Sequence, residues 1–181
     1  MIGIEVPNVV FKTRVRDESI GGDNPYRWQD VTTEELFAGK KIVLFSLPGA
    51  FTPTCSTYQL PRYEELYDEF KQYNVDEVYV LSVNDSFVMN KWLEHLNIKK
   101  VKPIPDGSGT FTRQMGMLVD KDNLGFGYRS WRYAMIVDDG VVEAVFPEAG
   151  QANNHPEDPY EISSPENVLN YCLAHSKNEA A

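Results

Sequence analysis

One cysteine stands where its thiol could act as a nucleophile. The turn "PGAFTPTC", residues 48–55, follows the apolar run "KIVLFSL" and places Cys55 at the head of a segment with helical spacing of apolar residues. A thiol attacks as its thiolate, and the unpaired N–H groups and positive dipole end of a helix N-terminus favour an anion. Open α/β sheets place ligands at the carboxyl ends of their strands. The pattern therefore predicts a reactive cysteine at Cys55.

Plainer interpretations of these residues stay open. Most free cysteines are small buried apolar residues, although the Pro, Gly and Thr residues before Cys55 form a shaped turn rather than a core segment. Thr52 lies three residues before Cys55. Its hydroxyl could cap the helix by accepting a backbone N–H, or it could hydrogen-bond both the sulfur and an oxygen bound beside it.

Length and charge limit the possible functions. With 181 residues, 42% of them hydrophobic, the chain is expected to form one domain over residues 1–181. The formal net charge of -10 would repel a phosphate backbone, so a nucleic-acid partner is not expected. No apolar run approaches the roughly 20 residues that span a bilayer, and the N-terminus lacks the pattern of a signal peptide. We expect a soluble, cytoplasmic protein with no membrane partner.

The cysteine and histidine positions argue against a metal or a disulfide framework. The chain has two cysteines, Cys55 and Cys172, which are far apart, and none of its three histidines stands beside a cysteine. We expect no metal and no cofactor. Cys172 lies among apolar residues of a predicted helix, "NVLNYCLAH", which favours a core or interface position over a catalytic one.

The elements that would position Cys55 follow from periodicity and turn residues. Strands are predicted within residues 6–16, 41–47, 76–84 and 101–109, and Asp139-Gly140 should join two more within 131–146. Residues 17–30 are predicted as a surface loop or hairpin. Helices are predicted within residues 31–40, from Cys55 to Phe70, and within 85–96, 108–117 and 162–175.

Residue types at the predicted helix starts indicate particular caps. Thr32 or Thr33 would begin the first helix, and Asn84 or Asp85 the helix at 85–96. The last helix would open with Ser164 before Pro165, or with Ser163 and Glu166 as a capping box. The order of elements predicts an α/β fold with a mixed central sheet and helices on both faces.

The motif around Cys55 resembles a known family. "PGAFTPTC" matches the PxxxTxxC signature of the peroxiredoxins at Pro48, Thr52 and Cys55, and "SVNDSFVMNKW", "IPDGSGTFT", "YRSWRYAMIVDDGVV" and "SSPENVL" follow in the order of the five-type (atypical, type II) branch. Within this branch the chain resembles the peroxidase domain of bacterial peroxiredoxin-glutaredoxin fusions. This resemblance implies a thioredoxin-like fold and covers nearly the whole chain, except for residues 17–30.

The resemblance also implies roles for individual residues. Cys55 would attack a hydroperoxide and become a sulfenic acid, and Pro48 would shield that product. Arg132, with Arg129 as the neighbour to be distinguished from it, would stabilise the thiolate and, with Thr52 and the Cys55 N–H, hold the peroxide oxygens. An arginine is usually a surface charge. However, Arg132 stands at the start of an apolar strand, where a buried guanidinium needs an anionic partner such as a thiolate.

Related enzymes with a second catalytic cysteine carry it at positions that lack cysteine here. This chain has Val80 at one of these positions and residues 161–164, "EISS", at the other. The expected cycle therefore uses one cysteine, with glutathione as co-substrate and glutaredoxin or a second glutathione completing the reduction. No glutaredoxin domain is attached within the 181 residues, so the reductant should come from another protein or from solution. A thioredoxin-dependent cycle through Cys172 is the alternative.

Family resemblance further suggests a homodimer formed through the surface around the active-site turn, with Phe51 as a contact.

Two other functions compete with the peroxidase. A hydrolase or transferase would need His95, His155 or His175 next to Cys55, and none belongs to a segment expected to meet the turn. A peroxide sensor or chaperone-like module would oxidise Cys55 without rapid turnover.

Overall fold

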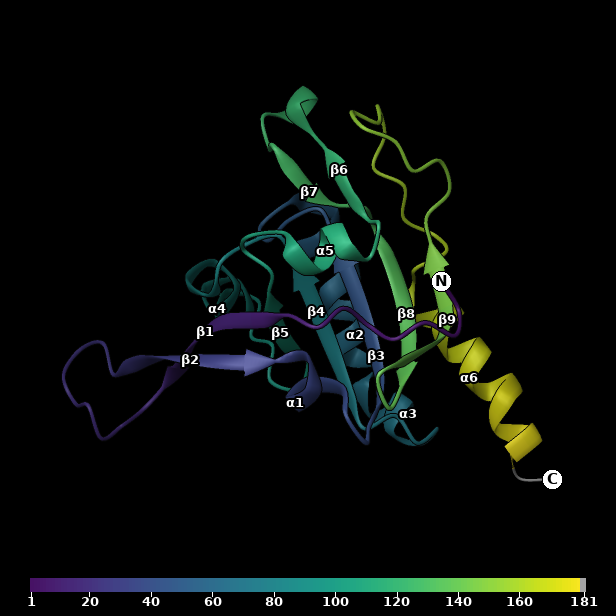
Figure 1. Ribbon diagram of the computed structural model, residues 1–181, viewed down its shortest axis with the longest axis horizontal. Coiled ribbons are helices and arrows are strands. Elements are labelled where there is room, and N and C mark those ends of the chain that lie inside the picture. Colours follow the sequence, from purple (N-terminus) through teal and green to yellow (C-terminus); the bar gives the residue numbers. More distant parts are fainter. Residues whose placement is uncertain (180–181) are drawn as a thin grey trace.

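A five-stranded mixed sheet forms the centre of the protein. The computed structural model describes residues 1–179. The strand order is β5-β4-β3-β8-β9 (Figure 1). Strands β3, β4 and β5 run parallel, whereas β8 and β9 run antiparallel to their neighbours. The bounds are β3 Lys41–Leu47, β4 Glu77–Ser82, β5 Lys102–Pro105, β8 Tyr133–Asp138 and β9 Val141–Pro147.

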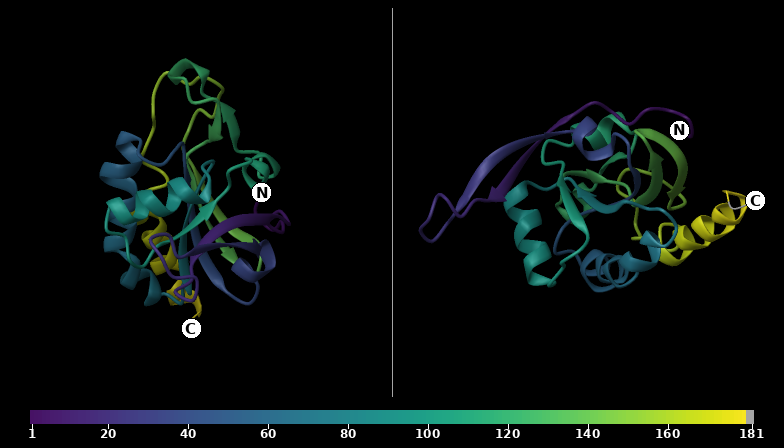
Figure 2. Two further views of the ribbon diagram at one scale, coloured as in Figure 1. Left: turned by 90° about the vertical axis from the view of Figure 1, so that its left-hand side faces the viewer. Right: turned by 90° about the horizontal axis from the view of Figure 1, so that it is seen from below.

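Helices cover both faces of this sheet, as predicted (Figure 2). Strand β3 has no exposed face, because Val43 and Phe45 belong to one apolar cluster and Ile42 and Leu44 to the other. On the first face lie α2 (Leu60–Glu65), α3 (Tyr67–Lys71), α4 (Ser86–His95) and α6 (Pro165–Glu179). On the second face lie α1 (Thr33–Phe37) and α5 (Thr110–Gln114).

Side-chain caps begin three of these helices. The hydroxyl of Thr32 accepts the N–H of Glu35 at the start of α1, and the Asp85 carboxylate accepts that of Val88 at the start of α4. Ser164 Oγ accepts the N–H of Asn167, so the last helix begins as predicted from Ser164 and Pro165.

The alternative capping box for α6 is wrong. The Ser163 hydroxyl donates to the buried Glu148 carboxylate at 2.6 Å, and Glu166 instead accepts from Arg62. At the β8–β9 turn the prediction holds, since Asp139 and Gly140 both have positive φ, 47° and 79°.

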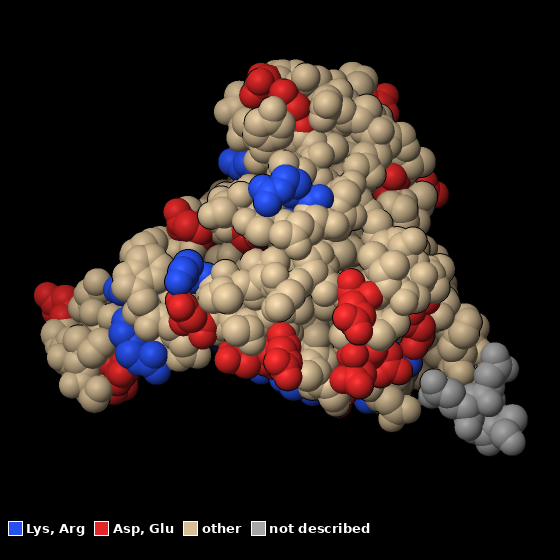
Figure 3. All heavy atoms as spheres, in the orientation of Figure 1, with Lys and Arg blue, Asp and Glu red and all other residues tan. Residues whose placement is uncertain are grey.

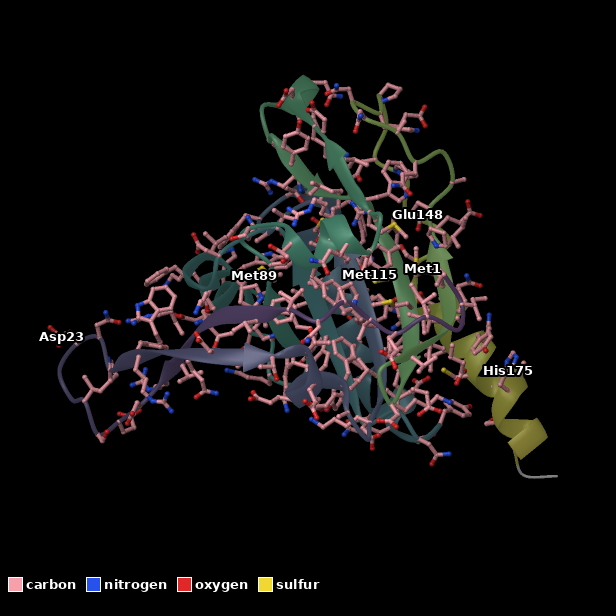
Figure 4. The ribbon with its side chains drawn as sticks, viewed as in Figure 1. Met1, Asp23, Met89, Met115, Glu148 and His175 are labelled. Carbon is pink, nitrogen blue, oxygen red and sulfur yellow. The ribbon has the colours of Figure 1, made fainter. Side chains whose placement is uncertain are left out.

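Two hairpins lie outside the central sheet. Strands β1 (Val10–Arg16) and β2 (Tyr26–Thr32) pair antiparallel and project from the body, with Asp23 near the tip (Figures 1 and 4). Of residues 17–30, residues 17–25 are the connecting loop of this hairpin and residues 26–30 begin β2. Strands β6 (Leu118–Asp120) and β7 (Tyr128–Ser130), joined through a 3-10 turn at Asp122–Leu124, form a second hairpin that was not predicted. Three-residue strands are too short to produce a periodic signal.

Within residues 1–179, no helix is long and apolar enough to cross a membrane, and no three His, Cys, Asp or Glu side chains cluster as metal ligands would. On the face drawn in Figure 3, Lys and Arg form small separate groups, whereas several Asp and Glu side chains gather over its lower part. This face has no continuous basic patch of the kind that follows a phosphate backbone.

Candidate active site

Cys55 lies in the first turn of a helix at the carboxyl end of β3. Helical residues begin at Pro53, directly after Thr52, and the Ser56 N–H donates to the Thr52 carbonyl to close the first turn. Proline is favoured at this first position because its fixed φ suits a helix and its missing N–H has no partner there. The turn before the helix includes Phe51 with φ 63°, a left-handed conformation that non-glycine residues seldom adopt. The local structure therefore places the thiol as the sequence predicted.

The helix after Cys55 is not the single α-helix that was predicted. Residues Cys55–Gln59 form a π-helical turn, in which the Leu60 N–H donates to the Cys55 carbonyl. The cause is Pro61, which has no N–H for the usual bond to the residue four positions earlier. A second break follows at Leu66, between α2 and α3. The apolar residues keep a helical spacing across both breaks. Periodicity alone therefore predicts one continuous helix.

Arg132 is the cation that contacts the sulfur. Its Nη1 lies 3.4 Å from Cys55 Sγ, and both residues are almost fully buried. Arg132 lies in the short connection between β7 and β8, so it directly follows the hairpin that was not predicted. Arg129 instead donates to the carbonyl of Pro48 at 3.0 Å. The structure thus distinguishes the two arginines by their partners.

Three further groups fix the Arg132 guanidinium. Its Nη1 also donates to the side-chain oxygen of Gln59, its Nε to the carbonyl of Pro159 at 3.1 Å, and its Nη2 to Asp158 at 2.6 Å. Burial lowers the pKa of Arg132, but the negative charges of Cys55 and Asp158 outweigh that effect and raise it overall. The guanidinium is therefore charged and held in one orientation against the sulfur.

Sequence reasoning missed these partners of Arg132. Gln59 follows Cys55 by four residues, so helical geometry alone would have placed the two side chains on the same face. Asp158 and Pro159 lie in the long segment 148–164 between β9 and α6, for which the sequence carried no periodic or motif signal. Figure 4 shows Glu148 at the start of this segment.

The turn before Cys55 is held by hydrogen bonds, both within the turn and to residues outside it. The Thr52 hydroxyl donates to the Gly49 carbonyl at 2.7 Å, and the Ala50 N–H donates to Asn84 at 3.0 Å. Within the described residues no N–H donates to this hydroxyl as a helix cap, and none of its hydrogen bonds reaches the sulfur. With its hydrogen used, Thr52 Oγ1 faces any further polar group as an acceptor.

One sequence-based expectation about the histidines is wrong. His95, at the end of α4, does meet the turn, because its ring centroid lies 5.9 Å from that of Phe51. His155 packs against Trp131, the residue before Arg132. No histidine within residues 1–179 hydrogen-bonds to Cys55 Sγ, whose partner is Arg132. The site offers a thiol and a guanidinium, and not a thiol with an imidazole base.

Cys172 is buried, and so is Val80 at one of the positions where relatives carry a second cysteine, whereas in the other, residues 161–164, Ser163 is buried and Glu161 exposed. Cys172 lies on the inner side of α6 with 4% of its surface exposed, and burial raises the pKa of its thiol to about 11. Both cysteines are free. Val80 is enclosed within β4, and Ser163 is fixed to Glu148.

The central mixed sheet is flanked by helices, as in a thioredoxin-like fold. One cysteine lies in the first turn of a helix, with a buried arginine in contact with its sulfur. Together the fold and the site define a thiol-based oxidoreductase. Comparison with known proteins narrows this class. A model of the Redoxin family matches residues 24–162. A peroxiredoxin of Rhizobium etli is 63% identical over 93% of this chain and 94% of its own length. The hybrid peroxiredoxin hyPrx5 of Haemophilus influenzae is 52% identical over 94% of this chain and 66% of its own length.

The fold comparison agrees with the sequence comparison. The crystal structure of the Plasmodium falciparum antioxidant protein, a 1-Cys peroxiredoxin, has 42% sequence identity and a TM-score of 0.88, covering 95% of this chain and 99% of its own. This chain belongs to the peroxiredoxin family, the thiol-dependent peroxidases. The predicted fold class and the predicted family are both confirmed.

Proposed function

We propose that Cys55 is the peroxidatic residue of a one-cysteine peroxiredoxin that reduces hydrogen peroxide and alkyl hydroperoxides and is recycled by glutathione with glutaredoxin. The observation that carries this proposal is the 3.4 Å contact between Arg132 Nη1 and Cys55 Sγ, in which a fully charged guanidinium faces the sulfur inside the protein. In addition to its ion pair with Asp158, the positive charge of Arg132 at this distance would stabilise an anion on the sulfur.

The first step is attack of the Cys55 thiolate on the terminal oxygen of the hydroperoxide. An S–O bond forms, the O–O bond breaks, and the leaving oxygen takes a proton to become water or an alcohol, which leaves a sulfenic acid on Cys55. Thr52 Oγ1 donates to Gly49, so it would accept a hydrogen from the bound peroxide. Arg132 and the Cys55 N–H would donate to the peroxide oxygens, and Pro48 would limit access to the sulfenic acid.

Thiolate formation accounts for only a small part of the catalysis. A free cysteine is a few per cent ionised at pH 7, so complete ionisation increases the reactive fraction about thirty-fold. Donors aimed at the charge that develops on the breaking O–O bond are each capable of several kcal/mol. The fixed orientation of the Arg132 guanidinium supports this second role.

The second half of the cycle is assigned to glutathione. Its thiolate would attack the sulfenic sulfur, releasing water and leaving a mixed disulfide on Cys55, and a second thiol, from glutaredoxin or glutathione, would then release Cys55. Val80 and residues 161–164 stand at the positions where relatives carry a second cysteine. Cys172 is buried with a raised thiol pKa, so little of it is thiolate at neutral pH. A thioredoxin-recycled cycle through Cys172 is the competing proposal.

We further propose a cytoplasmic homodimer. A reactive free thiol persists in reducing compartments, which supports the location. Phe51 is 49% exposed on the turn that carries Cys55, which makes it a suitable contact for a second copy. Gel filtration of the Phe51→Ser variant beside the unchanged protein tests the assembly, because loss of this contact should shift a dimer toward monomer.

Intact-mass analysis of the reduced protein after one equivalent of hydrogen peroxide tests the cycle. With glutathione present, the one-cysteine cycle gives a mixed disulfide on Cys55, and it forms equally well in Cys172→Ser. A loss of mass that corresponds to an internal or intersubunit disulfide, absent in Cys172→Ser, would instead make Cys172 the resolving residue. If Cys55 is not oxidised at all, the peroxidatic assignment is wrong.

A further inference from the structure

Arg129 is a cation beside the active-site turn, and no carboxylate within the described residues forms an ion pair with it. It lies in β7, three residues before Arg132. Both hydrogen bonds that its side chain makes within the described residues go to main-chain carbonyls: Nη1 donates to Pro48 at 3.0 Å and Nε to Phe126 at 3.3 Å. Arg132, in contrast, is paired with the Asp158 carboxylate. The charge of Arg129 is therefore available to a ligand.

The Arg129 guanidinium is held in place with one nitrogen left over. The Phe126 ring packs against it, with the ring centre 5.2 Å from Arg129 Cζ, and the two carbonyls bind Nη1 and Nε. Nη2 takes no part in these bonds, and it is not one of the buried side-chain atoms that lack a hydrogen-bond partner, so it is open to solvent. Its N–H groups suit a carboxylate oxygen, which is the strong partner of a guanidinium. Burial lowers the pKa of Arg129, which fits a cation that still lacks a counter-charge.

Contacts on both sides place this guanidinium at the edge of the peroxidatic site. It occupies the space that a Cβ on Gly49 would need, and the Thr52 methyl group borders the same space. Thr52 stands directly before the helix that carries Cys55, three residues from the cysteine. Along the chain, Arg132 follows three residues later and contacts the sulfur. Arg129 thus donates to the turn and not to the sulfur itself.

The charge of glutathione matches such a position. At neutral pH its two carboxylates outweigh its single ammonium group, so it is an anion. The protein has a formal net charge of -10 and repels anions as a whole. A cation without a carboxylate partner counteracts this repulsion beside the cysteine. Because several bonds separate the carboxylates of glutathione from its sulfur, an anchor next to the turn leaves the thiol free to reach Cys55.

We propose that Arg129 binds a carboxylate of glutathione and so gives anionic thiols an advantage in the reduction of oxidised Cys55. The inference rests on the proposed one-cysteine cycle and names the residue that recognises its co-substrate. In this step the glutathione thiolate forms an S–S bond to the sulfenic sulfur, the S–O bond breaks, and the hydroxyl takes a proton and leaves as water. Arg129 takes no part in these bond changes and acts only on the binding of the thiol.

The test compares two thiols that differ in charge, in the Cys172→Ser background. Cys55 is oxidised with one equivalent of hydrogen peroxide, and intact-mass analysis then times the mixed disulfide with glutathione or with its diethyl ester, in which both carboxylates are masked. Arg129→Gln should slow the reaction with glutathione about threefold to tenfold relative to the ester. Arg129→Lys keeps the charge and should keep most of the preference. Arg113→Gln, at an exposed arginine on α5, should keep all of it.

A second pair of probes needs no peroxide. Reduced Cys55 attacks the neutral dithiodipyridine or the dianionic dithiobis(nitrobenzoate), and each forms a mixed disulfide and releases a coloured thiol. Arg129→Gln should lower the rate with the anionic probe relative to the neutral one. If the ratio of the glutathione rate to the ester rate is the same in Arg129→Gln as in the unchanged protein, the proposal is wrong. If peroxide fails to oxidise Cys55, the proposed cycle is wrong, and the disulfide probes then decide whether Arg129 binds carboxylates.

Discussion

Arg132 Nη1 and Cys55 Sγ lie 3.4 Å apart in a part of the protein that water hardly reaches. Four protein groups contact the guanidinium: Cys55 and Gln59 from the helix that contains the cysteine, and Asp158 and Pro159 from the segment before α6. Because its orientation is fixed before any ligand arrives, little reorganisation is needed when charge develops on a peroxide oxygen. The contact thus suits stabilisation of the reaction as well as stabilisation of the thiolate.

The first prediction separates these two effects. Arg132→Ala should slow the reaction of Cys55 with hydrogen peroxide by about 100-fold to 1000-fold, because one preorganised charged donor is lost. Thr52→Val should also slow it, because the valine cannot accept the peroxide hydrogen. Both variants should remain slow at a pH where Cys55 is fully ionised. Stopped-flow measurement of the peroxide rate between pH 5 and pH 10 checks this.

Arg113→Ala is a matched control for this experiment, since Arg113 is an exposed arginine on α5. It should react at the unchanged rate across the pH range. Recovery of the full rate by Arg132→Ala or Thr52→Val at high pH would mean that the two residues only favour ionisation and do not act on the peroxide.

The second prediction concerns the buried cysteine. The pKa of Cys172 is raised to about 11, so at pH 8 about one molecule in a thousand carries the thiolate. In a Cys55→Ser variant, alkylation of Cys172 should therefore be far slower in the native protein than after denaturation, and it should increase about tenfold per pH unit up to pH 11. Mass spectrometry of timed samples measures both rates. Equal native and denatured rates at pH 8 would show that α6 does not protect this thiol.

Most of the fold followed from the sequence because its signals are local. The buried run of β3, the turn at Asp139-Gly140, and the caps Thr32, Asp85 and Ser164 each depend on a few neighbouring residues. The β6–β7 hairpin has strands too short for periodicity to detect. The π-helical turn after Cys55 depends on one missing N–H, at Pro61, within an apolar pattern that stays helical.

The site was predictable only in part, for a similar reason. Cys55, Thr52 and Pro48 belong to one motif, and Arg132 came from family resemblance. Asp158 and Pro159 reach the site through tertiary structure, from the long segment between β9 and α6. Nothing in the local sequence of these residues indicates which buried group they face.

The third prediction concerns Glu148, which fastens the segment that supplies Asp158 to Arg132. Its carboxylate accepts the N–H groups of Glu161, Ile162 and Ser163 and the Ser163 hydroxyl. Glu148→Gln would direct an NH₂ group at some of these donors, so stability should fall by about 1–3 kcal/mol. Urea unfolding measures the loss, and the exposed Glu161→Gln serves as the control. An unchanged midpoint for Glu148→Gln would mean that the segment does not depend on this carboxylate.

The last prediction concerns Gly49. The Arg129 side chain occupies the space that a side chain at Gly49 would need. A Cβ built on Gly49 would lie 2.3 Å from Arg129 Nη1, the atom that donates to the Pro48 carbonyl. Gly49→Ala should therefore displace the Arg129 guanidinium from Pro48, lowering stability by about 1 kcal/mol through the lost hydrogen bond and slowing peroxide reduction. Urea unfolding and the peroxide rate measure the two effects.

A double-mutant cycle shows whether the displaced arginine is the cause. In the Arg129→Ala background the space is empty, so adding Gly49→Ala should change stability and rate very little, and the two effects should not add. Strictly additive effects would mean that the alanine disturbs the turn itself, since its methyl group would also lie 3.3 Å from the Thr52 methyl carbon. In that case the added methyl group would displace Thr52, and the peroxide rate should decline by the same factor in both backgrounds.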